Sequence, residues 1–196
     1  MMAIMLQELP AKTEYSMRAI SAANTLSPAF GGADQRLGRK GSRFAIDVSI
    51  PALSAAGCGM GLIADLLRGE TETLVLAIPE HLPPVAYGAP VANGVSTGSV
   101  LAVKGLTPGA VIRKGKFLSI ILSGQRFVYM VTAEVTVPVG GLANLPIWPM
   151  LRRPTADGAI IELAAPKIEG FIEPGQDWSI NSLKAVGMSF TLKERE

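Results

Sequence analysis

Six carboxylates are the side chains of this 196-residue sequence that could most simply perform catalysis. Two carboxylates held roughly 5–10 Å apart are sufficient for acid–base hydrolysis of a glycosidic bond. Their positions in the sequence neither require nor exclude such a pair, so a small hydrolase stays one alternative. The six residues are Asp34, Asp47, Asp65, Asp157, Glu162 and Asp177.

The chain has one histidine, His81, and one cysteine, Cys58. A structural zinc site needs four nitrogen or sulfur ligands, and a Cys–His dyad would require these two isolated residues to meet. We interpret His81, in a proline-rich stretch, as a surface residue, and Cys58, among small residues, as a buried and unreactive thiol. A single cysteine allows no internal disulfide, which fits an intracellular site of synthesis.

Two glycine-rich segments resemble phosphate-binding motifs only superficially. Gly57–Gly61 lacks the last glycine of the dinucleotide fingerprint and does not directly follow a strand. Gly109–Lys116 is one residue too long for a phosphate-binding loop, and Phe117 replaces the Ser or Thr that would hold magnesium. We therefore predict no catalytic residue, no metal site, no cofactor and no enzymatic activity.

The composition indicates a chain whose surface is covered by partners. Hydrophobic residues make up 48% and charged residues 17%, and the mean hydropathy is +0.35. No apolar run approaches the roughly 18 residues of a membrane-spanning helix, so we expect no membrane span. An obligate oligomer, part of whose surface is buried between subunits, explains the low fraction of charged residues better than a membrane protein does. The net charge of +2 does not indicate a general nucleic-acid binder.

The segment Val95–Met150 organises the expected fold. Short β-branched and aromatic runs alternate there with glycine-containing breaks, which is typical of an antiparallel meander. One hairpin is expected to turn at Ser123–Gln125, and a second turn is expected at Pro138–Gly141. Further strands are expected over 14–21, 73–78, 159–164, 167–171, 178–181 and 186–193.

Arg43–Pro51 alternates apolar and polar residues and predicts a half-buried strand that ends at its proline. Ser54 is then expected to cap the only helix, at about 54–68. A long loop is expected over 22–42 and a proline-rich connector over 79–93. One face of the helix would carry Ala56, Met60, Ile63 and Leu67.

The predicted fold is mainly β, a β-sandwich or barrel-like antiparallel meander with one short α-helix. We expect an N-terminal β-rich subdomain with the helix over 1–80 and a C-terminal β-meander subdomain over 90–196. Basic residues cluster at the end of the first long loop, either as a solvated loop or as a subunit contact. The candidate contact residues are Arg36, Arg39, Lys40, Arg43, Trp148, Arg152 and Arg153.

Four segments, taken in order, resemble a group of tail proteins of bacteriophages with long non-contractile tails and of related prophages. The resemblance extends from about Tyr15 to Phe190, and its motifs are structural rather than catalytic. The segments are the strand with Tyr15 and Arg18 followed by RLGRKGSRFAIDVSIP (Arg36–Pro51), PVANGVSTGSVLAVKGLTP (Pro90–Pro108), RKGKFLSI (Arg113–Ile120) and LPIWPMLRRPTADGA (Leu145–Ala159).

The resemblance implies a virion structural protein, a distal tail or tail-tip subunit made in the host cytoplasm. It implies a homo-oligomeric ring, expected to be a hexamer, that joins the tail tube protein to the hub and receptor-binding proteins. The tape-measure protein and DNA would pass through the lumen of this ring. Ring subunits of this kind make heterologous contacts, and the rotation from each subunit to the next closes the ring. The alternative is a glycan-binding β-sandwich module of the tail tip, which would need exposed aromatic residues on one face.

Overall fold

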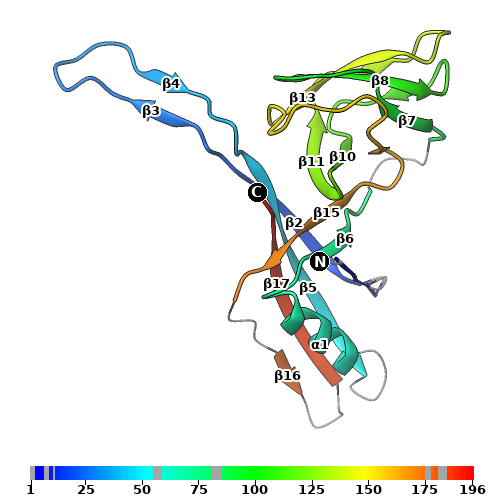
Figure 1. Cartoon of the computed structure of the whole chain (residues 1–196). Coiled ribbons are helices and arrows are strands. Elements are labelled where there is room, and N and C mark those ends of the chain that lie inside the picture. The colour runs from blue at the N-terminus through cyan, green and yellow to red at the C-terminus, as the bar shows by residue number, and fades with distance from the viewer. Residues whose placement is uncertain are drawn as a thin grey trace.

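The computed structural model describes residues 3–6, 9–10, 12–54, 59–80, 85–174, 178–180 and 185–196. It is mostly β with one short helix, α1 (Met60–Arg68), which confirms the predicted fold class (Figure 1). Two sheets make up most of the molecule, and we call them the long sheet and the barrel sheet. A thin hairpin projects away from both sheets.

The long sheet is built from both ends of the chain. Its strand order is β1-β6-β15-β17-β5-β2, and β16 pairs with the free part of β17. Most neighbours are antiparallel, and only β1 runs parallel to its neighbour β6. The strands are β1 (Ile4–Met5), β2 (Glu14–Ile20), β5 (Arg43–Ser54), β6 (Leu74–Ala77), β15 (Lys167–Ile172), β16 (Trp178–Ile180) and β17 (Ala185–Glu194).

The barrel sheet lies between β6 and β15 in the sequence. Its strand order is β14-β10-β11-β13-β8-β7, and a single bridge between Val91 and Ile160 brings its two edges together, so it is a nearly closed barrel. A two-stranded ribbon of β9 (Val111–Ile112) and β12 (Val135–Thr136) accompanies it. The barrel strands are β7 (Gly88–Ala92), β8 (Val100–Leu106), β10 (Phe117–Leu122), β11 (Gln125–Val131), β13 (Ala143–Trp148) and β14 (Ile161–Glu162).

This topology corrects the predicted C-terminal meander over 90–196. Its last strands, β15 to β17, leave the barrel and pair with β6 and β5 in the long sheet. The reason is the apolar face of β17, on which Phe190 lies opposite Val48 and Leu192 opposite Ile46 of β5. Alternation of apolar residues identified these strands but could not indicate which sheet would bury them.

The first predicted hairpin is present and the second is only partly so. Ser123 and Gly124 join β10 to β11 with φ angles of +51° and +78°, the pattern of a type I′ turn. At the second turn the Gly141 N–H donates to the Pro138 carbonyl at 2.9 Å. The strands on either side of that turn do not pair with each other, because β12 pairs with β9 and β13 with β8 and β11.

The predicted end of the strand at Pro51 was wrong, since β5 continues to Ser54, which therefore is not the helix N-cap. Pro51 is tolerated because it lies in a bulge, where two residues of β5 face one residue of β17 between the pairs Ile50–Met188 and Leu53–Val186. On the other side, β2 begins opposite Ser49 and needs no hydrogen bond from Pro51.

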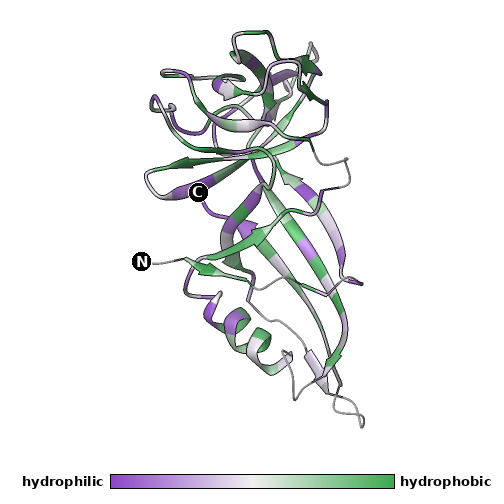
Figure 2. Ribbon diagram, turned by 90° about the vertical axis from the view of Figure 1, so that its right-hand side faces the viewer, coloured by the Kyte–Doolittle hydropathy of each residue, from purple (hydrophilic) through white to green (hydrophobic). Residues whose placement is uncertain are grey.

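Two apolar cores hold the two sheets. One fills the barrel, and the other lies on one face of the long sheet. On that face α1 covers one end and barrel strands β10 and β11 contribute Phe117, Val128 and Met130. Figure 2 shows this arrangement, with α1 beside the lower part of the long sheet and the barrel above it.

Helix α1 buries Leu62, Ile63 and Leu66, of which only Ile63 belongs to the predicted face. Met60 and Leu67 from that prediction are 49% and 47% exposed, and Ala56 lies outside the described residues. The prediction failed because this nine-residue helix carries apolar side chains around most of its circumference.

Candidate functional site

The predicted loop over 22–42 is a projecting hairpin, which we call the arm and define as residues 22–41. It contains β3 (Asn24–Leu26) and β4 (Gln35–Leu37), which pair with each other only. Every residue from 23 to 36 is exposed, and Figure 1 shows the arm extending well away from both sheets. An isolated two-stranded hairpin is marginally stable in water. The strands of the arm therefore gain no support from either sheet of their own subunit.

The tip of the arm is apolar. The Phe30 side chain is fully exposed, and Leu26 is 49% exposed. Gly31 and Gly32 have φ angles of +80° and +140°, and glycine adopts such angles without a steric penalty. Burying one phenylalanine side chain contributes about 1.5–3 kcal/mol. The tip thus offers a concentrated source of binding free energy that its own chain does not use.

The root of the arm is held firmly against the long sheet. The Ala22 N–H donates to the Ser42 hydroxyl at 3.0 Å, which ties the two sides of the root together. Arg43, the first residue of β5, forms an ion pair with Glu196 near the end of β17. The arm therefore leaves the molecule in a defined direction.

Three of the seven candidate contact residues lie on this arm. Arg36, Arg39 and Lys40 are exposed, and none of them forms an ion pair within the part of the chain that the structure describes. Arg43 differs from them, because its side chain is mostly covered and paired within the chain. The basic cluster of the sequence is thus divided between an exposed arm and its buried root.

The other candidates lie at the opposite side of the root, where the barrel meets the long sheet. Trp148 packs edge-on against Phe44, with ring centroids 5.2 Å apart, and stays partly exposed. Arg153 is exposed and lies 5.4 Å from the centroid of the Phe127 ring. Arg152 has only 6% of its side chain exposed. We assign Arg152 to the interior of the subunit.

Arg152 belongs to a buried ion pair that sequence reasoning missed. Its partner is Glu194, whose side chain has no exposed surface. The Glu194 carboxylate accepts the Val128 N–H of the barrel at 2.7 Å and the Phe44 N–H of the long sheet at 3.0 Å. One carboxylate therefore connects both sheets. Burial raises the pKa of Glu194, and Arg152 together with the two backbone donors opposes that rise.

A second carboxylate, Glu162, joins the barrel edge to β15. It accepts hydrogen bonds from Arg126 at 2.9 Å, Ser119 at 2.8 Å and Lys167 at 2.8 Å. Burial works to raise the pKa of Glu162, but these hydrogen bonds outweigh it and lower the pKa. A carboxylate with three donors is held ionised and is not free to take a proton at neutral pH.

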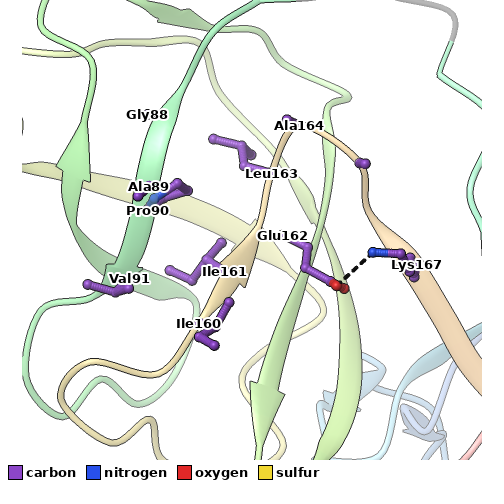
Figure 3. A pocket seen from close by; sticks show the side chains of 11 residues that line it. Gly88, Ala89, Pro90, Val91, Ile160, Ile161, Glu162, Leu163, Ala164 and Lys167 are labelled. Atoms are coloured by element: carbon purple, nitrogen blue, oxygen red, sulfur yellow. Dashed lines mark hydrogen bonds and ion pairs between the residues drawn. The ribbon is translucent and has the colours of Figure 1, made fainter. Parts of the chain in front are cut away.

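The pocket in Figure 3 lies beside the open seam of the barrel, between β7 and β14, and has a volume of about 360 Å³. Its walls are the backbone of Gly88–Val91 and aliphatic side chains including Ile160 and Leu163. Its charged residues are Glu162 and Lys167, which pair with each other. The pocket therefore presents an apolar surface without a reactive group.

The carboxylates considered for hydrolysis do not gather in this pocket. Asp47 bonds to Arg18 and Thr191, and Asp157 pairs with Lys104 at 2.7 Å. Of the five that the structure describes, only Glu162 lines the pocket. Asp177, His81 and Cys58 lie outside the described residues.

Within the residues that the structure describes, no group of three or more His, Cys, Asp or Glu side chains could hold a metal ion. No helix in this part of the chain is long and apolar enough to cross a membrane. Compared with known proteins, the chain matches no protein-family model and no curated protein.

Proposed function

We propose that this protein is a structural subunit of a bacteriophage tail, forming a ring at the distal end of the tail tube. The observation that supports it is the arm, whose residues 23–36 are all exposed and whose tip carries Phe30. Each subunit of a ring must contact the next through a surface that its own fold leaves free, and the arm is such a surface.

Three further features support the same proposal. The sequence resembles tail proteins of phages with long non-contractile tails, as described above. The low fraction of charged residues suits a chain that is covered on several sides. The arm is firmly anchored at its root, and a preordered segment loses less conformational entropy when it binds. In the virion, the ring would connect the tail tube to the hub and receptor-binding proteins.

The test is the mass of the purified full-length chain in solution over a range of concentrations. Native mass spectrometry and light scattering should show one closed oligomer, with the hexamer as the expected state. Negative-stain electron microscopy should show rings with a central opening.

A shortened-arm variant provides the matched comparison. In it Asn-Gly replaces residues 24–37, which allows a two-residue turn between the two sides of the root. We expect this variant to stay monomeric with a nearly unchanged melting temperature, because all the removed residues except Leu37 are exposed. A monomeric wild-type chain at all concentrations would contradict the proposed ring. Rings of the shortened variant would show that the ring closes without the arm and would contradict the role that we give to the arm.

A further inference from the structure

Helix α1 has a second apolar face that its own subunit leaves uncovered. Met60 and Leu67 are 49% and 47% exposed, and Ala64 between them is also exposed. These three residues have the spacing i, i+4, i+7 and so lie on one side of the helix. Leu62, Ile63 and Leu66 already pack against the long sheet. The exposed stripe adjoins the buried residues around the helix, and Gly61, Asp65 and Arg68 occupy the remaining side, so the apolar surface of α1 is wider than its own subunit covers.

The arm and this outer face lie at opposite ends of the same strand. The arm enters β5 at Arg43, and β5 ends at Ser54, shortly before α1. A strand of 12 residues spans about 40 Å. Figure 1 shows the arm pointing away from the end of the long sheet that carries α1. The arm of a subunit therefore does not reach its own helix, but the arm of another copy can.

The charges of the two surfaces are complementary. The arm carries Arg36, Arg39 and Lys40 against one carboxylate, Asp34. The segment 60–72 carries three carboxylates against one arginine. Of these, Glu72 pairs with Arg68 at 2.8 Å. Asp65 and Glu70 have no ion pair among the described residues, so they are available to a basic partner.

We propose that the arm of one copy docks on the outer face of α1 in the neighbouring copy. Phe30 and Leu26 cover the stripe of Met60, Ala64 and Leu67, and the basic residues of the arm are attracted to the acidic segment 60–72. The contact is heterologous, so every copy gives an arm and receives one, as a closed ring requires. This inference rests on the proposed ring and names the surface that closes it.

Two single variants and their mixture test the docking. Phe30→Asp removes the apolar tip, and Leu67→Lys places a cation where the basic arm would dock while keeping a good helix former. Each variant should weaken self-association at least about tenfold, because each removes one central side chain of the contact. Val139→Asp, on a fully exposed turn of the barrel, is the control and should assemble like the wild type. Circular dichroism and thermal melting verify that all three variants fold.

The mixture gives the sharpest result. The Leu67→Lys chain keeps an intact arm, and the Phe30→Asp chain keeps an intact helix face. Mixed in equal amounts, they should form a pair of one copy each and stop there, because neither free end can continue. Native mass spectrometry would detect this pair by its mass.

The failures of the two proposals are distinguishable. If Leu67→Lys assembles like the wild type while Phe30→Asp does not, the arm docks elsewhere and this inference is overturned, while the ring stands. If both variants fail and their mixture also stays monomeric, the two surfaces do not meet each other. If the wild type itself is monomeric throughout, the ring fails first.

Discussion

The buried carboxylate of Glu194 allows a quantitative prediction about how the barrel is attached to the long sheet. Replacing Glu194 with leucine keeps a side chain of similar size but removes every acceptor that it provides. The Phe44 and Val128 N–H groups lose their partner, and so does the Arg152 guanidinium. The Arg152 guanidinium keeps one hydrogen bond, from Nη1 to the Arg195 carbonyl at 3.2 Å, while its Nε has no partner among the described residues. Its charge would then stay buried without a carboxylate.

Removing one partner of a buried ion pair costs about 3–5 kcal/mol, because the remaining charge stays buried. The two backbone donors would add about 1–3 kcal/mol each if no water reached them. These costs overlap, and we expect E194L to lower the free energy of unfolding by about 3–5 kcal/mol. That loss is a large share of the about 5–15 kcal/mol by which single domains are stable.

The assay is urea unfolding at neutral pH, followed by tryptophan fluorescence and by circular dichroism. Trp148 packs against Phe44 at this junction and reports on it directly. The double variant E194L/R152L removes the uncompensated charge and should recover about 1–3 kcal/mol of the loss. E134Q changes an exposed carboxylate and should stay within about 0.5 kcal/mol of the wild type.

Two results would refute this reasoning. One is a loss below about 1 kcal/mol for E194L, which would mean that the carboxylate is not needed at the junction. The other is a double variant E194L/R152L that is no more stable than E194L. It would mean that burying the Arg152 charge without a carboxylate does not lower the stability. If E194L does not fold at all, E194Q retains one acceptor and extends the comparison.

Three further predictions concern other positions. A Cβ at Gly170 would lie 1.9 Å from the Lys193 carbonyl oxygen, so G170A should cost at least about 2 kcal/mol in the urea assay. A Cβ at Gly61, on the exposed side of α1, would have no atom within 4 Å, so G61A should raise the free energy of unfolding by about 1 kcal/mol. If G170A and G61A changed the stability equally, the contrast between these two glycines would be wrong. Because the folded-state pKa of Glu162 is lowered, its stabilising contribution is complete above the unfolded value of about 4.3 and is lost as the pH falls through the folded value. Between about pH 5 and 3 the wild type should therefore lose stability more steeply than E162Q, and parallel curves would refute it.

The sequence was sufficient for the fold class because the strands of this protein have strong local signals. Arg43–Ser54 and Ala185–Glu194 alternate apolar and polar residues, and Ser123-Gly124 has the composition of a tight hairpin turn. Sheet membership was not predictable in the same way. The pairing of β17 with β5 joins residues more than a hundred positions apart, and no local pattern specifies that choice.

The candidate site could be predicted only in part. The basic residues of the arm stood out by composition, but the arm itself was expected to be an irregular loop, since its strands have only three residues each. Phe30 could have been noticed as a large apolar residue among glycines and polar residues. The role of Glu194 had no signal in the sequence, because its partners come from β5, β11 and the segment after β13.

The arm and the buried junction are parts of one mechanical unit. Phe44, whose N–H donates to the Glu194 carboxylate, is the second residue of β5 and directly follows the arm root. Its neighbour Arg43 is paired with Glu196, so both ends of this short segment are fixed by the last residues of the chain. Since Arg152 and Val128 attach the same carboxylate to the barrel, the direction of the arm is set relative to both sheets. A fixed direction lowers the entropy lost when the arm docks, so a junction that serves no catalysis can still determine how tightly copies of the chain assemble.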